Sequence, residues 1–305
     1  MYNGVINVYK EPGFTSFDVV AKLRGILKQK KIGHTGTLDP DAEGVLVVCL
    51  GKATKLCSVL TDKDKSYEAT LLLGRITDTE DSSGKLLEHR EVAATEEEVR
   101  SAVLSFIGEY DQIPPMYSAI KVNGKKLYEL AREGIEIERK PRTVVIHQIE
   151  ILSMNLPYVT FRVACGKGTY IRSLCRDIGD KLGCGGIMDK LVRNSVFAAE
   201  TGKTFTADEA LTLNEIKDKV ENKQIDDYIL PIDSMFPELA KVQVTVEGNK
   251  KLYNGNLLKA KDFIEDCQDA ADGEQYLVYD KDGSFAAIYR FYEEPHVWKA
   301  DQMFI

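Results

Sequence analysis

The residues best suited to chemistry lie in one short loop, Gly33–Gly44, with the sequence GHTGTLDPDAEG. Three glycines and a proline surround one histidine, His34, and one aspartate, Asp39. Glycine and proline favour tight turns, and the apolar run Val45–Leu50 that follows predicts a buried strand or helix. The sequence therefore predicts a specific loop that holds the Asp39 carboxylate in place.

The residues alone leave several interpretations of this loop to weigh. Calcium is disfavoured, because the twelfth position of a calcium loop starting at Asp39 is Leu50 instead of a bidentate glutamate, and Pro40 intrudes. A phosphoryl-accepting aspartate should end an apolar strand, whereas glycine, histidine and threonine precede Asp39. An aspartate that only caps a turn before Pro40 is common, and this interpretation stays open.

The run GHTGTLDPDAEGVL resembles the signature of the TruB-type tRNA pseudouridine synthases, and this resemblance implies that Asp39 is the catalytic aspartate. Further stretches resemble motifs of the family in the family's order and cover most of residues 4–235. The first is Lys-Glu-Pro-Gly-Phe-Thr-Ser from Lys10, in which Glu11 departs from the usual Lys-Pro-x-Gly-x-Thr-Ser. The others are Tyr-Glu-Ala-Thr from Tyr67, Gly-Thr-Tyr-Ile-Arg-Ser-Leu from Gly168 and Leu-Val-Arg from Leu191.

The resemblance also implies roles for individual side chains. Tyr67 would stack on the target base, and Arg172 would pair with Asp39, so these three form the expected catalytic set. An arginine in this pair would keep Asp39 ionised, because a nearby opposite charge offsets the cost of burying a carboxylate. The residues expected to bind substrate are Lys10, His34, Tyr170 and Leu191.

The implied reaction breaks the bond from ribose C1′ to uracil N1, turns the base and rejoins it through C5. It needs no redox change and no metal, so we expect neither a cofactor nor a metal site. The nucleotide must be flipped out of its stack, which suits Tyr67 and His34. The residues leave open whether Asp39 attacks C6 of uracil, attacks C1′ of ribose or assists elimination to a glycal.

The implied partner is tRNA, through its T-arm stem-loop, and the implied target is the uridine at position 55 of the T-loop. Two other functions stay open. One is guide-dependent pseudouridylation of another RNA, which a lack of activity on free tRNA would favour. The other is a non-catalytic chaperone that refolds tRNA. This function would be favoured if a catalytically dead variant kept every effect of the wild-type protein.

Composition predicts a soluble globular protein. The 305 residues are 44% hydrophobic and 29% charged, enough for one large core and a small second domain. The six cysteines form no Cys-x-x-Cys pair, so we expect reduced thiols and no structural zinc. No apolar run of membrane-spanning length or N-terminal export segment is present. We expect a cytoplasmic monomer that does not bind membranes.

The net charge of -8 argues at first sight against an RNA partner, but the charge is unevenly distributed. Residues 1–200 carry 28 basic and 27 acidic side chains, whereas residues 201–305 carry 12 and 21. Local basic patches in the first part would therefore have to attract RNA.

The N-terminal elements must position the Asp39 loop. Residues 4–10 predict a short strand, and Thr15 or Ser16 caps a helix. The helix is expected to bury Phe17, Val20, Leu23 and Leu27 and to present Lys22, Lys28, Lys30 and Lys31 on its other face.

In the middle of the chain, the sequence pattern predicts strands and helices around the other motifs. Strands are expected at 67–74, 144–153 and 158–165, and helices at 95–107 and 170–182, the last ended by Gly183. Residues 112–142, rich in Lys, Arg and Tyr, resemble the family's mobile RNA-binding insertion.

After residue 235 the sequence changes to short β-like runs, 241–246, 275–279 and 285–291, separated by turns. We therefore expect an α+β protein. By resemblance it has the pseudouridine synthase fold, a central mixed or antiparallel sheet flanked by helices, with a small C-terminal β domain of PUA type. The expected domains are residues 1–235, with the insertion 112–142, and residues 236–305.

Overall fold

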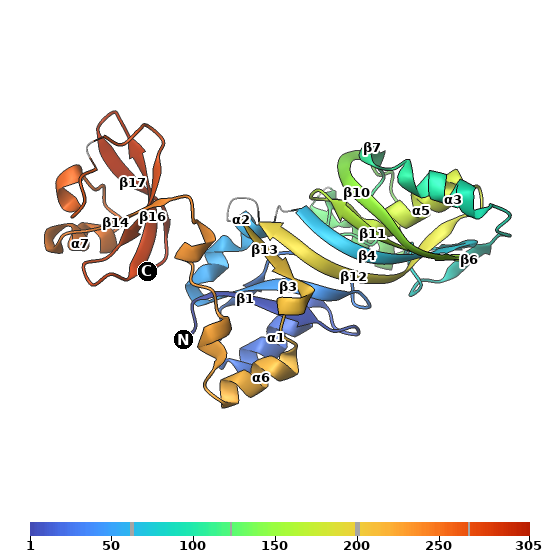
Figure 1. Ribbon diagram of the computed structural model, residues 1–305, viewed down its shortest axis with the longest axis horizontal. Helices are drawn as coiled ribbons and strands as arrows, with labels where there is room; N and C mark the ends of the chain where they lie inside the picture. The colour runs from blue at the N-terminus through green and yellow to red at the C-terminus, as the bar shows by residue number, and fades with distance from the viewer. Residues whose placement is uncertain (62–63, 123, 199–201, 268) are drawn as a thin grey trace.

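The computed structural model describes residues 1–61, 64–122, 124–198, 202–267 and 269–305 (Figure 1). Its large sheet contains β1 (Gly4–Lys10), β2 (Ile32–His34), β3 (Glu43–Leu50), β4 (Asp64–Leu73), β7 (Gly108–Gln112), β10 (Arg142–Asn155), β11 (Tyr158–Cys165), β12 (Gly186–Ala198) and β13 (Lys203–Thr206). The order is β1-β3-β12-β4-β11-β10-β7, with β2 beside β3 and β13 beside β12. The pairing of β3 with β12 is parallel and the other pairings are antiparallel, so the expected mixed sheet is confirmed.

Strand β3 explains the apolar run that follows the Asp39 loop, because it is buried on both faces. Its alternate side chains enter two different clusters. Val45, Val47 and Cys49 pack in one, and Leu46, Val48 and Leu50 pack in the other. The strand that leaves the loop is thus fixed on both sides of the sheet.

Helices cover the two ends of the large sheet, as expected for an α+β fold (Figure 1). Helices α1 (Ser16–Ile26) and α6 (Leu213–Glu221) pack on β1 and β3. Helices α3 (Glu96–Leu104) and α5 (Ile171–Lys181) pack on β4, β10 and β11. The Asp39 loop leads into β3, and Arg172 lies in the first turn of α5, so the packing of α5 on the sheet brings the two side chains together.

Local signals in the sequence predicted the helix ends well. Thr15 caps α1 and Thr95 caps α3, each in a capping box with the acidic residue three positions on. Helix α5 ends before Gly183, whose φ of 74° lies in the left-handed region that favours glycine. The paired strands expected at 144–153 and 158–165 are β10 and β11. Helix α3 ends at Leu104, three residues before the expected end.

The predicted buried face of α1 was wrong at Phe17, which is 63% exposed. The buried positions of the helix are Ser16, Val19, Val20 and Leu23. A hydroxyl faces inward at Ser16 because it is hydrogen-bonded to the backbone of Leu38, in the Asp39 loop. Val20, Leu23 and Leu27 are buried as expected, so Phe17 is the single predicted position of this face that lies outside the core. Lys22, Lys28, Lys30 and Lys31 are exposed, as expected.

The C-terminal part forms a separate four-stranded sheet, which confirms the expected small β domain. Its strands are β14 (Ala240–Gln243), β15 (Gln275–Tyr279), β16 (Phe285–Tyr292) and β17 (Val297–Met303), in that order. The strand expected at 241–246 was wrong beyond Gln243, because Thr245 caps helix α7 (Val246–Tyr253). Strand β17, which contains the buried Trp298, was not anticipated.

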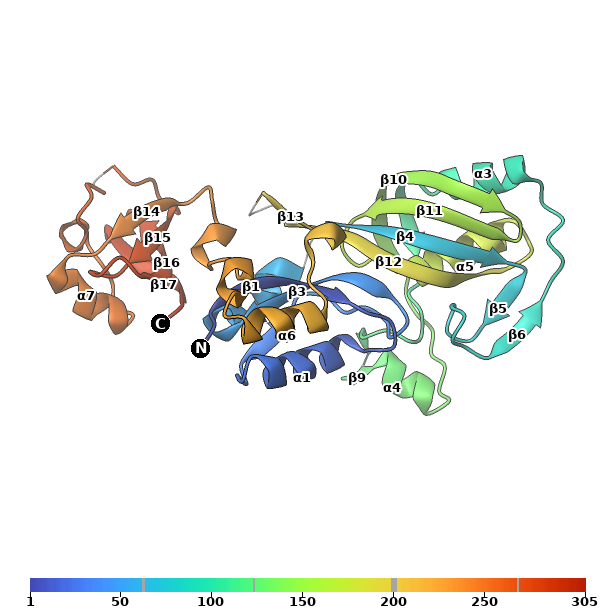
Figure 2. The ribbon, with the colours of Figure 1, turned by 60° about the horizontal axis from the view of Figure 1, so that its bottom comes forward.

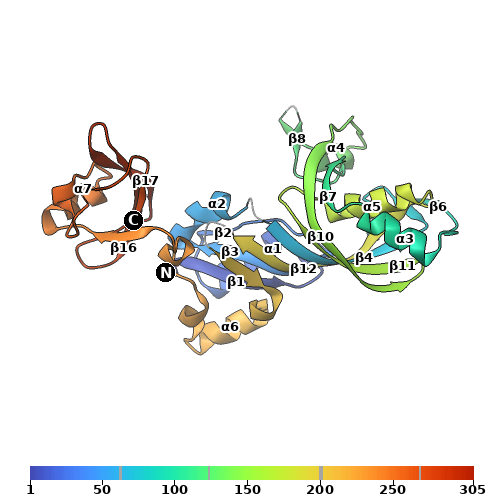
Figure 3. The same cartoon turned by 45° about the horizontal axis from the view of Figure 1, so that its top comes forward.

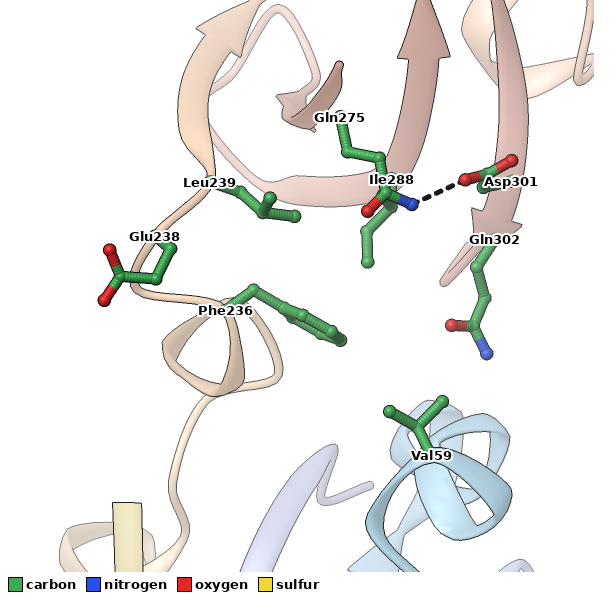
Figure 4. A pocket seen from close by; sticks show the side chains of 8 residues that line it. All are labelled: Val59, Phe236, Glu238, Leu239, Gln275, Ile288, Asp301 and Gln302. Carbon is green, nitrogen blue, oxygen red and sulfur yellow. Dashed lines mark hydrogen bonds between the residues drawn. The ribbon is translucent and has the colours of Figure 1, made fainter. Parts of the chain in front are cut away.

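The two sheets share an apolar contact. Leu277, Ile288 and Phe304 of the C-terminal part belong to the same buried cluster as Val5 and Met235. Gln302 also donates a hydrogen bond of 2.9 Å to the carbonyl of Lys55. Beside this contact lies an open cavity of about 430 Å³, lined by Val59, Phe236, Glu238, Leu239, Gln275, Ile288, Asp301 and Gln302 (Figure 4). The domain boundary at residues 235 and 236 stays a prediction.

Candidate active site

The Asp39 loop connects β2 to β3, and buried polar side chains fix its backbone from several elements. Ser16 accepts a hydrogen bond from the Leu38 N–H at 2.9 Å and donates one to the Leu38 carbonyl at 3.3 Å. The Gly13 N–H donates to the Pro40 carbonyl at 2.9 Å. Buried backbone groups need such partners, so these contacts define the path of the chain on both sides of Asp39.

Lys10 lies behind the loop rather than on its open side. Its side chain is fully buried, and its Nζ donates to the carbonyls of Glu11, Pro40 and Ala42. Burial lowers the pKa of this ammonium to about 8. The carboxylates of Asp39 and its neighbours raise the pKa and offset part of this effect. All three contacts of the ammonium are with backbone carbonyls, so this geometry favours a positioning role for Lys10, and its expected substrate contact stays a prediction.

Lys10→Met should lower stability by about 1–3 kcal/mol, because it leaves buried carbonyls without their donor. It should leave the salt dependence of tRNA binding unchanged, because the ammonium is buried and bonded to backbone carbonyls. The measurements are thermal unfolding and tRNA affinity at several salt concentrations. A change of about one unit in the log–log slope would instead restore Lys10 as a phosphate contact.

Arg193, at the centre of β12, is a second buried anchor and is 2% exposed. Its Nε donates to the Val45 carbonyl at 2.7 Å, and its Nη2 donates to the Gly36 carbonyl at 3.2 Å. The parallel register places Arg193 opposite Gly44. A Cβ on Gly44 would lie 2.3 Å from the Arg193 carbonyl, and the φ of Gly44 is 104°, so this position requires glycine.

Asp39 and Arg172, 133 residues apart in the sequence, form a bidentate ion pair. Arg172 Nε lies 3.0 Å from Asp39 Oδ2, and Nη2 donates to Oδ1 at 3.3 Å. The arginine side chain is 6% exposed, whereas that of Asp39 is 36% exposed. The carboxylate is therefore oriented from behind and accessible from outside, as a group that meets a substrate must be.

The remaining donors of Arg172 are also used. Nη1 donates to the Thr79 carbonyl at 3.0 Å, and Nη2 donates to the Tyr117 carbonyl at 2.9 Å. Asp81 Oδ2 lies 3.7 Å from Nη1. The guanidinium is thus held between two carboxylates and two carbonyls, which leaves it little rotational freedom.

The charge state of Asp39 reflects a balance of burial and neighbours. Burial raises the pKa of this carboxyl above its usual value, Arg172 and Lys10 lower it, and Asp81 and Asp41 raise it. If the ionised form is needed, activity is present above this pKa and is lost as the pH falls through it. Arg172 therefore extends the active range toward acid pH.

Tyr67 and Leu191 flank the loop on adjacent strands. Both belong to the buried cluster that includes Leu38 and Ala42, on either side of Asp39. Tyr67 is 8% exposed, lies opposite Arg193 in the pairing of β4 with β12, and has its pKa raised to about 12 by burial. The structure therefore brings Tyr67, Leu191 and Arg172 together around Asp39.

His34 and Tyr170 lie at the edges of this arrangement. His34 is half-buried at the end of β2, and its Nδ1 accepts the Gly36 N–H at 3.4 Å. Burial lowers its pKa, which favours the neutral ring. Tyr170 precedes α5, and its backbone N–H donates to Gln112 Oε1 at 2.8 Å, at the start of the insertion. Their expected substrate contacts stay predictions.

Several residues of the site were not anticipated: Ser16, Asp81 and Arg193. Arg193 had a signal in the sequence, since it is the third residue of the Leu-Val-Arg motif, of which only Leu191 was considered. Ser16 likewise ends the motif that begins at Lys10, although only its capping of the helix was considered. Asp81 lies 91 residues from Arg172 in the sequence, so no local pattern indicates it.

Three further observations concern the residues that the structure describes. Among them, no group of three or more His, Cys, Asp or Glu side chains could hold a metal ion. None of the helices within the described ranges is both long and apolar enough to cross a membrane. None of the six cysteines forms a disulfide bond.

Comparisons with known proteins identify the family of the chain. The profile described as TruB family pseudouridylate synthase (N terminal domain) matches residues 24–171, and that described as tRNA pseudouridylate synthase B C-terminal domain matches residues 172–237. A tRNA pseudouridine synthase B of Lachnoclostridium phytofermentans is 55% identical, with 99% of this chain and 100% of that protein covered. One of Alkaliphilus oremlandii is 49% identical, with 91% and 89% covered.

Solved structures give the same result for the fold. A chain in the crystal structure of a Cbf5-Nop10-Gar1 complex superposes with a TM-score of 0.68 at 27% identity, covering 99% of this chain and 85% of that one. A chain in the structure of an H/ACA RNP bound to a substrate RNA containing 2'-deoxyuridine has a TM-score of 0.66 at 25% identity, covering 99% of this chain and 85% of that one. The chain belongs to the TruB family of pseudouridylate synthases.

Proposed function

We propose that this chain converts uridine to pseudouridine at position 55 in the T-loop of tRNA, with Asp39 as the catalytic carboxylate. The observation that carries the proposal is the Arg172–Asp39 pair, a buried arginine that orients an accessible carboxylate within the family's signature loop. The relatives named tRNA pseudouridine synthase B support tRNA as the substrate.

The reaction can be assigned to side chains without a cofactor. Uracil loses its bond from N1 to C1′ and gains one from C5 to C1′, so the proton lost from C5 is balanced by one gained at N1. Asp39 acts in its ionised form, whether it attacks C6 or C1′ or assists elimination to a glycal. Arg172 keeps it ionised, and Tyr67 would cover one face of the flipped base.

The surfaces proposed to bind the T-arm are basic and partly aromatic. The insertion contains the hairpin β8 (Lys121–Val122) and β9 (Lys125–Lys126), followed by α4 (Leu127–Arg132), and these elements project from the large sheet (Figure 3). Lys126 and Arg132 lie over the Tyr128 ring, 5.2 and 5.4 Å from its centroid. Such pairs suit unpaired bases and phosphates. Figure 2 shows α4 on the same side of the sheet as α1, which carries Lys22.

The test is to treat T-arm stem-loop RNA with the purified protein and to map pseudouridine by mass. Modification confined to the T-loop uridine supports the proposal, with Asp39→Asn protein as the matched negative control. No product on free tRNA would favour a guide-dependent enzyme. A variant that lacks turnover but keeps every effect on tRNA folding would favour a chaperone. A cytoplasmic location and a monomeric state are proposed with this function.

A chain truncated after Pro237 should still modify the isolated T-arm stem-loop and should lose affinity mainly for full-length tRNA. The reason is charge, since residues 201–305 carry 12 basic and 21 acidic side chains. Its unfolding temperature should fall, because the loss of Leu277, Ile288 and Phe304 uncovers part of an apolar cluster. The measurements are circular dichroism, turnover and salt-dependent binding on both RNAs. Equal, large losses on both RNAs in a folded truncated protein would place the tail in the catalytic core.

A further inference from the structure

Glu80 occupies an unusual position beside the active site. It lies in the turn of residues 78–85, between β5 (Arg75–Thr77) and β6 (Leu86–His89). Its φ is 64°, in the left-handed region that few residues other than glycine adopt, and its side chain is only 11% exposed. A buried glutamate in such a backbone must be held by specific contacts.

The contacts of the Glu80 carboxylate are all with helix α5. Oε2 accepts a hydrogen bond from Ser173 Oγ at 2.7 Å, and Oε1 pairs with the guanidinium of Arg176. Arg176 also pairs with Asp177 at 2.7 Å and donates to the Ile113 carbonyl at 3.0 Å, at the start of the insertion. The partners of Glu80 follow Arg172 by one and four residues, on the same turns of the helix.

The neighbours of Glu80 in the turn are the groups that orient Arg172. The Thr79 carbonyl accepts a hydrogen bond from Nη1 at 3.0 Å, and the Asp81 carboxylate lies 3.7 Å from the same nitrogen. The turn is also joined to β12, because the Met188 N–H donates to the Glu80 carbonyl at 3.0 Å. If the carboxylate of Glu80 released α5, the turn would keep its bond to β12 but would lose two of its ties to the helix that carries Arg172, so the Thr79 and Asp81 groups would be held less firmly against the guanidinium.

We propose that Glu80 is a positioning residue for the reaction: its bonds to Ser173 and Arg176 clamp the 78–85 turn onto α5 and thereby align Arg172 with Asp39. This rests on the proposed function, in which ionised Asp39 is the catalytic group. Glu80 acts through other residues and contacts neither Asp39 nor the solvent-accessible side of the site.

Glu80→Gln should lower the single-turnover rate at least tenfold, measured as tritium released from tRNA uridine labelled at C5. The KM for tRNA should stay within about twofold, because the side chain is buried. The acid limb of the rate profile should move to higher pH. Arg172 and Lys10 lower the pKa of Asp39 while Asp81 and Asp41 raise it, so a misaligned Arg172 weakens the lowering.

The direction in which the acid limb moves distinguishes a positioning role of Glu80 from a direct effect of its charge on Asp39. Removing the negative charge of Glu80 without moving Arg172 could only lower the pKa of Asp39. An acid limb that stays in place or moves to lower pH, with a rate near wild type, overturns the inference. Ser173→Ala, which removes one of the two clamp contacts, should give a smaller shift in the same direction, and it decides the question if Glu80→Gln does not fold.

Asp262→Asn is the matched control. Asp262 is also a buried carboxylate, with a side chain 4% exposed and paired with Lys251 at 2.7 Å, but it lies in the C-terminal part. It should lower the unfolding temperature without moving the acid limb. Wild-type protein and Asp39→Asn are assayed alongside. The proposed function fails if the wild type makes no pseudouridine in tRNA or if Asp39→Asn remains active. If Asp39→Asn is inactive but Glu80→Gln has normal kinetics, only the role of Glu80 is refuted.

Discussion

Asp39→Asn should reduce turnover by roughly three orders of magnitude or more while leaving the fold and tRNA affinity unchanged. The change is isosteric and removes only the charge, so the amide oxygen can still accept a hydrogen bond from Arg172. It cannot act as a nucleophile or a base toward the flipped uridine. The measurements are tritium release in single turnover, equilibrium tRNA binding and thermal unfolding.

The matched control for this variant is Asp41→Asn, two residues further along the same loop. Asp41 is exposed, and its side chain is not oriented by Arg172 as that of Asp39 is. It should keep nearly full turnover, with at most a small shift of the acid limb, because its charge contributes to the pKa of Asp39. Turnover near wild type in Asp39→Asn, or an equal loss in both variants, would remove Asp39 from the catalytic role.

Arg172→Lys should lower turnover by roughly two to three orders of magnitude, although the positive charge is kept. The guanidinium meets both oxygens of Asp39 and also donates to the carbonyls of Thr79 and Tyr117. An ammonium at the end of a flexible chain cannot reproduce this planar arrangement, so Asp39 loses its orientation and buried carbonyls lose their donors.

The same substitution should move the acid limb of the rate profile upward. Arg172 lowers the pKa of Asp39, and a displaced charge lowers it less, so ionised Asp39 is lost at a higher pH. Arg162→Lys is the control, because Arg162 is 46% exposed and pairs with the exposed Glu150. Normal kinetics and an unchanged pH profile for Arg172→Lys would make Arg172 a bystander.

Much of the fold could be predicted from local patterns. The capping boxes at Thr15 and Thr95 located two helices, because a cap is a contact within four residues. The strands β10 and β11 followed from their composition and the short connection between them. Strand β12 was not predicted, although it lies at the centre of the sheet, next to both β3 and β4. The position of β12 in the sheet depends on partner strands far away in the sequence, and local hydrophobic periodicity carries no information about them.

The sequence alone determined the family, through the loop around Asp39 and the motifs around Tyr67 and Arg172. It also predicted the helix end at Gly183, because a helix end constrains the backbone locally. These features are encoded within a few residues of one another, so they can be recognised without knowledge of the fold.

The tertiary structure alone decided what the remaining polar side chains do. It buried Lys10 against backbone carbonyls, placed Arg193 beneath the loop and joined Glu80 to α5. The physical reason is that a buried polar group is defined by the partner that satisfies it. Arg193 and the Gly36 carbonyl are 157 residues apart in the sequence, and only the register of β12 beside β3 brings them together.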